Sequence, residues 1–242
     1  MGTGSTEVTP LERQQLLVVQ RATFWHRVRF GFVWRAMRRT GASTVVDLGA
    51  GSGVLGQWLQ ATREGTGYRF AESSPHLAVG LRERFGSANE VRIGDALPPR
   101  SVVAMLDVIE HIDDDVAALT AVAGSMDDAS LLVVTVPALP SLFSSWDTAL
   151  GHHRRYTRRS LRTALESAGF HVERVHYLFP ELLPIALLRR VRRSEGSSAD
   201  FPSLPTWVDR VGGVVSGLSA VMSRVWPAGT SLVAVASTGG RR

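Results

Sequence analysis

The stretch VVDLGAGSGVLG, residues 45–56, decides the fold. A short β-branched run ends at an acidic residue, a glycine-rich turn follows, and an apolar helical pattern begins directly after it. Gly51, Gly53 and Gly56 match the spacing G-x-G-x-x-G of a dinucleotide-binding turn. The stretch therefore predicts a strand, a turn and a helix, and it raises the question of which nucleotide the turn holds.

The alternation of strand and helix continues downstream of this stretch. The patterns predict strands at 67–72, 90–94, 101–107, 130–136, 171–178 and 231–237, and helices at 75–85, at 114–124 and before Gly169. Apolar strands that alternate with amphipathic helices favour a mainly parallel sheet covered on both faces. The fold class is therefore α/β.

Helical segments flank this core. We predict an N-terminal helical segment at 1–40 with a capping box in TPLE at 9–12, an α/β core at 41–179, a helical insertion or lid at 180–229, and a last strand with tail at 230–242. In the insertion, apolar residues at spacings of four and three form a seam: Trp207, Val211, Val214, Leu218, Val221 and Val225. The seam suits packing onto the sheet, a substrate lid, a homodimer contact or a protein partner. We do not expect contact with a membrane surface.

Composition limits the classes of protein that fit. With 44% hydrophobic and 20% charged residues among 242, the chain is typical of one folded domain with additions. Its net charge of +5 comes from arginine clusters without an accompanying nucleic-acid-binding motif, so we expect no nucleic-acid partner. The absence of cysteine excludes thiolate zinc sites, and we predict no metal site. The opening residues lack a basic stretch that leads into an apolar one, and the longest apolar runs are far shorter than a membrane span, so we expect a cytoplasmic protein.

The acidic residues near the turn bear on the nucleotide. Asp47 closes the first strand immediately before the turn, where it would repel the pyrophosphate of NAD and favour a ligand with a cationic amino group. The glycines are then better taken from Gly49 as D-x-G-x-G-x-G, and the match at Gly56 is coincidental. Glu72 at the end of the second strand can accept hydrogen bonds from a ribose diol, and Asp95 from an adenine amine.

With these motifs in order, the sequence resembles the class I S-adenosylmethionine-dependent methyltransferases. The resemblance rests on VVDLGAGSG, FAESSP, GDAL and MLDVIEHIDDD, and more narrowly on FWHRVRF and SSWDTALGHHRRYTRRSLRTALESAGF, which are similar to a bacterial small-molecule branch. It implies a Rossmann-like, seven-stranded, mainly parallel sheet whose last strand is antiparallel. It also implies S-adenosylmethionine as the cofactor.

By position, the resemblance assigns cofactor-binding roles. The glycine turn cradles the cofactor, Asp47 contacts its methionine end, Glu72 its ribose and Asp95 its adenine, while Asp107 orients the acceptor or the methionine amine. Ala96 adds a backbone contact. The implied set is Asp47, Gly49, Gly51, Gly53, Glu72, Asp95, Ala96 and Asp107.

Proton transfer points to two candidate segments. A hydroxyl or ammonium acceptor must lose a proton, for which a histidine is the usual base near neutral pH. His111 follows DVIE after the fourth strand, and it could serve as that base or only bond the turn before the next helix. The segment GHHRRYT, residues 151–157, offers His152, His153 and Arg155 for proton handling or anion recognition, or for helix capping and surface ion pairs.

The sequence leaves three functions open. The first is methyl transfer to oxygen or nitrogen of a small molecule, either anionic or uncharged, in bacterial secondary metabolism. The second is the same scaffold redirected to cyclisation or elimination of an anionic leaving group. The third is a non-catalytic subunit that binds a partner, which the intact glycine motif disfavours.

Overall fold

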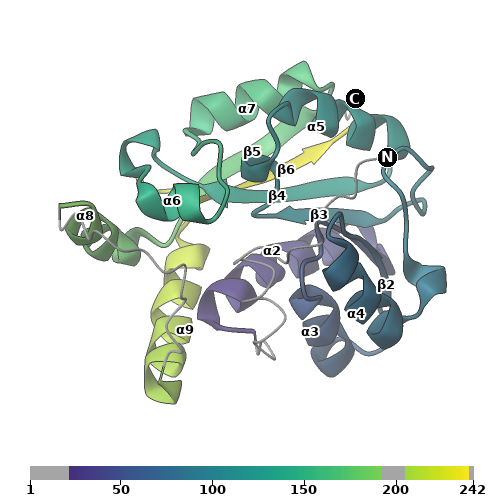
Figure 1. The fold of residues 1–242 in the computed structure, drawn as a ribbon, viewed down its shortest axis with the longest axis horizontal. Coiled ribbons are helices and arrows are strands. Elements are labelled where there is room, and N and C mark those ends of the chain that lie inside the picture. Colours follow the sequence, from purple (N-terminus) through teal and green to yellow (C-terminus); the bar gives the residue numbers. More distant parts are fainter. Residues whose placement is uncertain (1–21, 192–204, 240–242) are drawn as a thin grey trace, which may run out of the picture.

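A six-stranded sheet organises the chain (Figure 1). The computed structural model describes residues 22–191 and 205–239, so the predicted capping box at 9–12 lies outside the described residues. The strands are β1 (Thr44–Leu48), β2 (Gly67–Ala71), β3 (Val102–Leu106), β4 (Leu131–Pro137), β5 (His171–Leu178) and β6 (Ser231–Ser237), in the order β2-β1-β3-β4-β6-β5. β1, β2, β3 and β4 are parallel, and β6 lies antiparallel between β4 and β5. The predicted antiparallel last strand is confirmed.

The prediction of a strand at 90–94, which would make the sheet seven-stranded, is wrong: the described residues form six strands. Glu90 makes one isolated parallel bridge to Phe70 of β2, and Val91 donates one backbone hydrogen bond to the Phe70 carbonyl. Beyond that point Gly94 has φ +104°, and Ile93 is 53% exposed. The apolar alternation was real, but this segment would form an edge strand, and the turn at Gly94 ends its pairing with β2.

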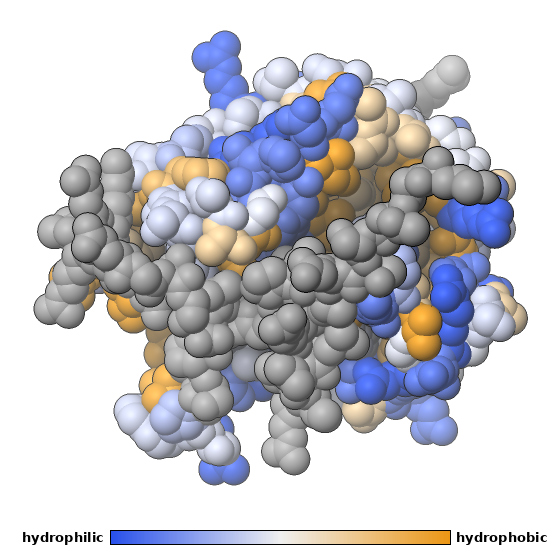
Figure 2. All heavy atoms as spheres, viewed as in Figure 1, coloured by the Kyte–Doolittle hydropathy of each residue, from blue (hydrophilic) through white to orange (hydrophobic). Residues whose placement is uncertain are grey.

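Helices cover both faces of the sheet (Figure 1). One core lies between the sheet and α2 (Phe24–Thr40), α3 (Val54–Thr62) and α4 (Pro75–Phe85). The other lies beneath α5 (Asp115–Ser125) and α7 (Arg158–Ser167), where Leu119, Leu161 and Leu165 are fully buried. Hydrophilic side chains gather over this second helical layer at the top of Figure 2. The short α6 (Ser145–Ala149) follows β4.

Local capping explains the helix starts. Ser74 accepts a hydrogen bond from the Leu77 backbone and Pro75 occupies the first turn, so α4 begins where the sequence predicts. Thr157 accepts from Ser160 and caps α7. Single 3-10 turns link other elements: η1 (Ser87–Asn89), η2 (Ile109–His111), η3 (Pro140–Leu142) and η4 (Pro180–Leu182).

The insertion forms α8 (Leu183–Val191) and α9 (Thr206–Val221). α9 packs on α2 through small residues: a Cβ at Gly212 would lie 2.8 Å from Phe24, and Asp209 accepts the Phe24 backbone N–H at 2.6 Å. The predicted apolar seam therefore does not pack onto the sheet. Its residues are exposed, from 55% at Val211 to 72% at Val221. Hydrophobic side chains are visible over α8 and α9 at the left of Figure 2.

Among the described helices, none has the length and hydropathy needed to cross a bilayer.

Candidate active site

The glycine turn after β1 has a backbone that side chains would block. Gly49, Gly51 and Gly53 all have positive φ, at +75°, +56° and +77°. A Cβ at Gly49 would lie 2.7 Å from the Val108 side chain, and one at Gly53 would lie 2.7 Å from Leu81 and from Phe85. Only glycine combines this conformation with this close approach. The amides of Gly49 and Ala50 donate to the Ala71 carbonyl, so the turn is fixed against the end of β2 directly before the N-terminus of α3.

Glycine is required at position 56 for helix packing and not for the turn. A Cβ there would lie 2.5 Å from Tyr68 Cε1 and 2.7 Å from Phe85 Cζ, because α3 lies directly on aromatic side chains of β2 and α4. Close helix packing is also what the third glycine of a dinucleotide-binding turn provides. The G-x-G-x-x-G match thus reflects shared packing, although it does not select NAD.

Glu72 ties the turn to the end of β2. Its Oε2 accepts a hydrogen bond from the Gly51 backbone at 2.7 Å, and its Oε1 accepts one from Ser74 at 2.8 Å. Both carboxylate oxygens thus already have backbone donors. Each oxygen can accept a further bond, so the side chain can hold the turn and still receive a hydroxyl.

Asp47 lies beneath the turn with an exposure of only 4%. Tyr68 donates its hydroxyl hydrogen to Asp47 Oδ2 at 2.8 Å. Burial, with a smaller contribution from nearby Glu72, raises the pKa of Asp47 from 3.8 to about 7, although the hydrogen bond from Tyr68 opposes the shift. The carboxyl group is therefore near its midpoint at neutral pH.

We expect this pKa to make stability depend on pH. The unfolded chain releases the Asp47 proton near pH 3.8 and the folded chain near pH 7, so the folded state holds the extra proton between these values. The free energy of unfolding then falls as pH rises from about 4 to about 7 and levels off above, by at most about 1.4 kcal/mol per pH unit. Urea denaturation at pH 5 and at pH 8 measures this fall in the free energy of unfolding. Asp47→Asn removes this component, and a wild-type-minus-variant difference independent of pH would contradict the prediction.

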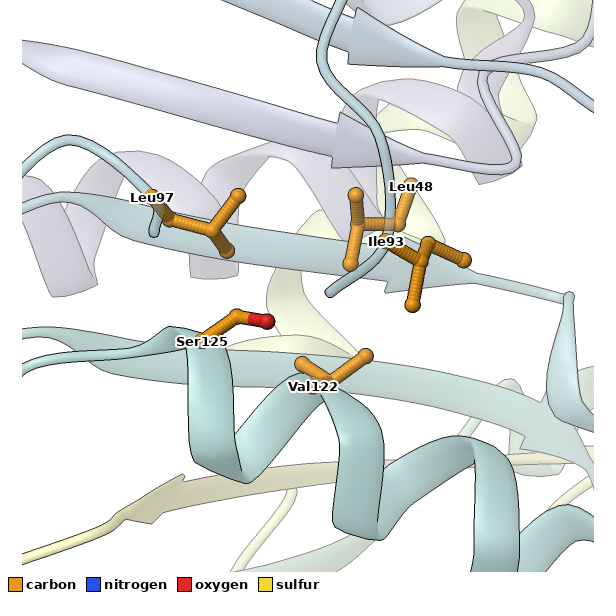
Figure 3. A pocket seen from close by; sticks show the side chains of 5 residues that line it. All are labelled: Leu48, Ile93, Leu97, Val122 and Ser125. Atoms are coloured by element: carbon orange, nitrogen blue, oxygen red, sulfur yellow. The ribbon is translucent and has the colours of Figure 1, made fainter. Parts of the chain in front are cut away.

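Asp95 and Ala96 follow the bridge segment and are exposed. Next to them, Leu48, Ile93, Leu97 and Val122 line a small apolar hollow, together with Ser125 (Figure 3). Leu48 ends β1, and Val122 and Ser125 belong to α5. The two residues predicted to contact adenine are therefore beside an apolar surface at the end of β1.

Asp107 is held by an ion pair. Its Oδ2 lies 2.9 Å from Arg29 of α2, its Oδ1 accepts a hydrogen bond from Thr135 at 3.1 Å, and its φ is +58°. Leu139 follows β4 and Phe179 follows β5, and both also have a positive φ. At this edge of the sheet, three strands are therefore each followed by a residue with left-handed backbone. Such strain is typical of functional sites. Arg100, the fourth non-glycine case among the described residues, precedes β3 at the opposite edge.

His111 and His152 are brought together, as sequence alone could not show. Their rings make an edge-to-face contact with centroids 4.7 Å apart. Burial, and then the neighbouring His152, lower the pKa of His111, so its imidazole is neutral at pH 7. Glu110 is fully buried beside them, and burial raises its pKa well above the usual range, with nearby Asp107 adding to the shift.

A buried carboxylate positions the second half of this cluster. Asp147 of α6 is 0% exposed and lies 3.0 Å from His152 Nδ1 and 2.7 Å from Arg155 Nε. Arg155 also donates to the Ala138 carbonyl at 3.2 Å. The guanidinium of Arg155 thus orients Asp147 and anchors the loop.

His153 lies apart from this group. Its side chain is 47% exposed, and its Nδ1 is 3.9 Å from Asp113. Arg154 pairs with Asp115 at 3.1 Å, and Tyr156, which donates to the same carboxylate, is buried. Of the four predicted catalytic residues, the structure therefore brings His111 and His152 into contact, and Arg155 is linked to His152 through Asp147.

Sequence reasoning missed Arg29, Glu110 and Asp147. All three lie inside stretches that carry the family resemblance, FWHRVRF, DVIEH and SSWDTAL, but ordinary charged residues give no sign of burial. Arg29 pairs with Asp107, which is far from it in the sequence, and the burial of Glu110 and Asp147 arises only from packing.

A sequence model described as a methyltransferase domain matches residues 24–175, well over half of the chain. The chain belongs to this methyltransferase family. No curated protein matches the sequence. Family membership makes S-adenosylmethionine the cofactor of this domain.

Solved structures share the fold of the methyltransferase domain at low identity. An S-adenosylmethionine-dependent methyltransferase from Archaeoglobus fulgidus is 17% identical, with a TM-score of 0.51 over 86% of this chain and 94% of that one. The cyclase SpnF is 13% identical, with a TM-score of 0.56 over 96% and 94%. Phosphoethanolamine N-methyltransferase 2 from Haemonchus contortus, in complex with S-adenosylmethionine, is 16% identical, with a TM-score of 0.53 over 99% and 61%.

The residues present fit this cofactor. The glycine turn would cradle it: glycine at 49 and 53 lets the turn lie directly against Val108 and against Leu81 and Phe85, and the Glu72 carboxylate stands at its side with capacity for a further hydrogen bond. Beside Asp95, Leu48, Ile93 and Val122 offer an apolar surface against which an aromatic base would pack.

Proposed function

We propose that the protein transfers a methyl group from S-adenosylmethionine to an oxygen or nitrogen of a small molecule. The observation that carries the proposal is the common edge of the sheet: the glycine cradle follows β1, and the histidine pair follows β3 and β4. A Cβ at Gly49 would meet Val108, so the cradle and the segment leading to His111 are in direct contact.

In this proposal Gly49, Gly51 and Gly53 provide the cradle for the cofactor, and Glu72 accepts from the ribose. The Asp95 carboxylate accepts a hydrogen bond from adenine, and the Ala96 backbone N–H donates one to it, beside the apolar hollow. When bound, S-adenosylmethionine supplies an electrophilic methyl group. Asp47, buried below the turn, acts on the methionine end through the turn itself and not by an exposed carboxylate.

His111 is the base in this proposal. Its lowered pKa keeps the imidazole neutral and able to accept a proton, and the backbone of Gly151 hydrogen-bonds to it. His152 stands next to it, and Arg155 positions His152 through Asp147. Asp107 orients the acceptor from the end of β3 while paired with Arg29.

The arginines of GHHRRYT do not favour an anionic acceptor. Arg154 is paired with Asp115 and Arg155 with Asp147, so their charges are already compensated. We therefore favour an uncharged acceptor, in the cytoplasm and in bacterial secondary metabolism. The exposed seam of α9 leads us to place a second copy or a protein partner at 180–229.

The test is calorimetric titration with S-adenosylmethionine and with its demethylated product. We expect micromolar binding of both by the wild type, and a loss of at least tenfold in Asp47→Asn/Glu72→Ala, since a lost charged hydrogen bond costs about 1.5–3 kcal/mol. His171→Asn, an exposed change on β5, serves as the matched control and should bind like the wild type. A folded wild type that binds neither compound would refute the proposal.

A further inference from the structure

Three side chains at the candidate active site converge from two separate loops. Glu110 and His111 lie in η2, which follows β3, and His152 lies in the loop after α6. One ligating atom from each of the three is within 4.8 Å of the others. Two imidazoles and one carboxylate are a common set of protein ligands for first-row divalent metals.

Glu110 gives an independent reason to expect a cation. The residue is 0% exposed, and among the described residues neither Oε1 nor Oε2 has a hydrogen-bond partner. An unpartnered buried carboxyl group is costly, and most buried polar groups in proteins are satisfied. The nearby cations do not fill this need, since Arg29 is paired with Asp107 and Arg155 with Asp147.

The surroundings of both histidines resemble those of metal ligands. Asp147 lies 3.0 Å from His152 Nδ1, so a proton shared there leaves Nε2 as the free, neutral ligand atom. Arg155 in turn fixes Asp147 at 2.7 Å. The imidazole of His111 is hydrogen-bonded to the backbone of Gly151. Such outer partners fix the tautomer and direction of a ligating ring.

We propose that Glu110, His111 and His152 bind one divalent transition-metal ion of the Zn²⁺ or Fe²⁺ class. Bonds of about 2.0–2.2 Å place ligand atoms roughly 3.5 Å apart, so the three groups close by about 1 Å when the ion enters. Rotation of the two imidazoles supplies this movement. The site replaces the sequence-based expectation of no metal.

Three protein ligands leave a coordination position open. A water or an acceptor hydroxyl that takes this position loses its proton to solvent more readily, because the ion stabilises the anion. With the ion bound, the free nitrogen of His111 is a ligand, so the ion replaces His111 as the group that promotes the loss of this proton. This consequence rests on the proposed methyl transfer, whereas metal binding itself does not. It narrows the acceptor class to molecules with a hydroxyl group.

The experiment is titration of the full chain, freed of metal with a chelator, with Zn²⁺ and with Co²⁺. We expect one equivalent of Zn²⁺ and visible ligand-field bands of Co²⁺ in a four- or five-coordinate site. Glu110→Gln and His152→Asn should weaken Zn²⁺ binding at least 100-fold. His171→Asn, which removes an exposed imidazole far from the cluster in sequence, should bind like the wild type.

Two outcomes would overturn the proposal: no stoichiometric binding by the wild type, or equal binding by Glu110→Gln and the wild type. Near-ultraviolet circular dichroism of each variant shows whether it is folded, and Glu110→Gln preserves the shape of the side chain. Titration of the same samples with S-adenosylmethionine separates the two proposals. Cofactor binding without metal binding refutes only the metal site, and the reverse refutes only the cofactor assignment.

Discussion

Gly53→Ala is expected to destabilise the protein by about 2–4 kcal/mol. The backbone at Gly53 has φ +77°, which costs an alanine about 1 kcal/mol. The new Cβ would also lie 2.7 Å from Leu81 and Phe85, which are buried in the core beneath α4, and overpacking costs about 1–3 kcal/mol more. Urea denaturation measures the difference. Affinity for S-adenosylmethionine should fall at least tenfold, because the displaced turn is the proposed cofactor cradle.

Gly65→Ala is the matched control for this change. Gly65 has φ +81°, but a Cβ there meets no heavy atom within 4 Å. The control therefore carries the conformational cost of about 1 kcal/mol without the packing cost, and cofactor affinity should stay within twofold. Equal losses of stability in the two variants would show that the close approach at Gly53 is not tight.

Asp147→Ala is expected to lower the free energy of unfolding by about 3–5 kcal/mol. The carboxylate has no exposed surface, and its removal leaves Arg155, whose side chain is 14% exposed, without its ion-pair partner. Burial favours a raised pKa at Asp147, but the bonds from His152 and Arg155 outweigh it and hold the pKa below its usual value. The stabilisation is therefore present above the ordinary carboxyl range and is lost as pH falls through the lowered folded-state value.

Two further variants test the origin of this effect. Asp147→Asn keeps the shape and some hydrogen bonds, so it should cost less than the alanine change. Glu166→Ala removes the exposed partner of Arg162 on α7, a surface pair at 3.2 Å, and should change the free energy of unfolding by about 0.5 kcal/mol or less. If denaturation gave Asp147→Ala and Glu166→Ala the same loss in the free energy of unfolding, the buried pair would contribute no more than a surface pair.

The sequence predicts elements well where local chemistry decides them. α4 has the predicted bounds 75–85 because Ser74 and Pro75 set its start and Gly86, with φ +85°, follows its end. The segment at 90–94 has the alternation of a strand, but whether it pairs along its length depends on the turn at Gly94 and on its place at the sheet edge. Pattern alone does not contain that information.

The candidate site divides in the same way. The place of the glycine turn can be predicted because its glycines and the acidic residues after successive strands are spaced by the fold itself. The contact between His111 and His152 cannot, since it depends on how the loops after β3 and β4 approach each other. The burial of Asp147 and Glu110 is likewise a property of packing, and their side chains are usually exposed in proteins.

The left-handed residues Asp107, Leu139 and Phe179 have a consequence for engineering this protein. Backbone idealisation is a standard route to greater thermal tolerance, and glycine at such positions relieves about 1 kcal/mol each. Here that route leads to the edge that holds the glycine turn and the histidines, so gains in heat resistance there would alter the proposed active site and, at Asp107, would remove a side chain assigned to it. Arg100, exposed at the opposite edge, is the position where the same relaxation leaves the chemistry untouched.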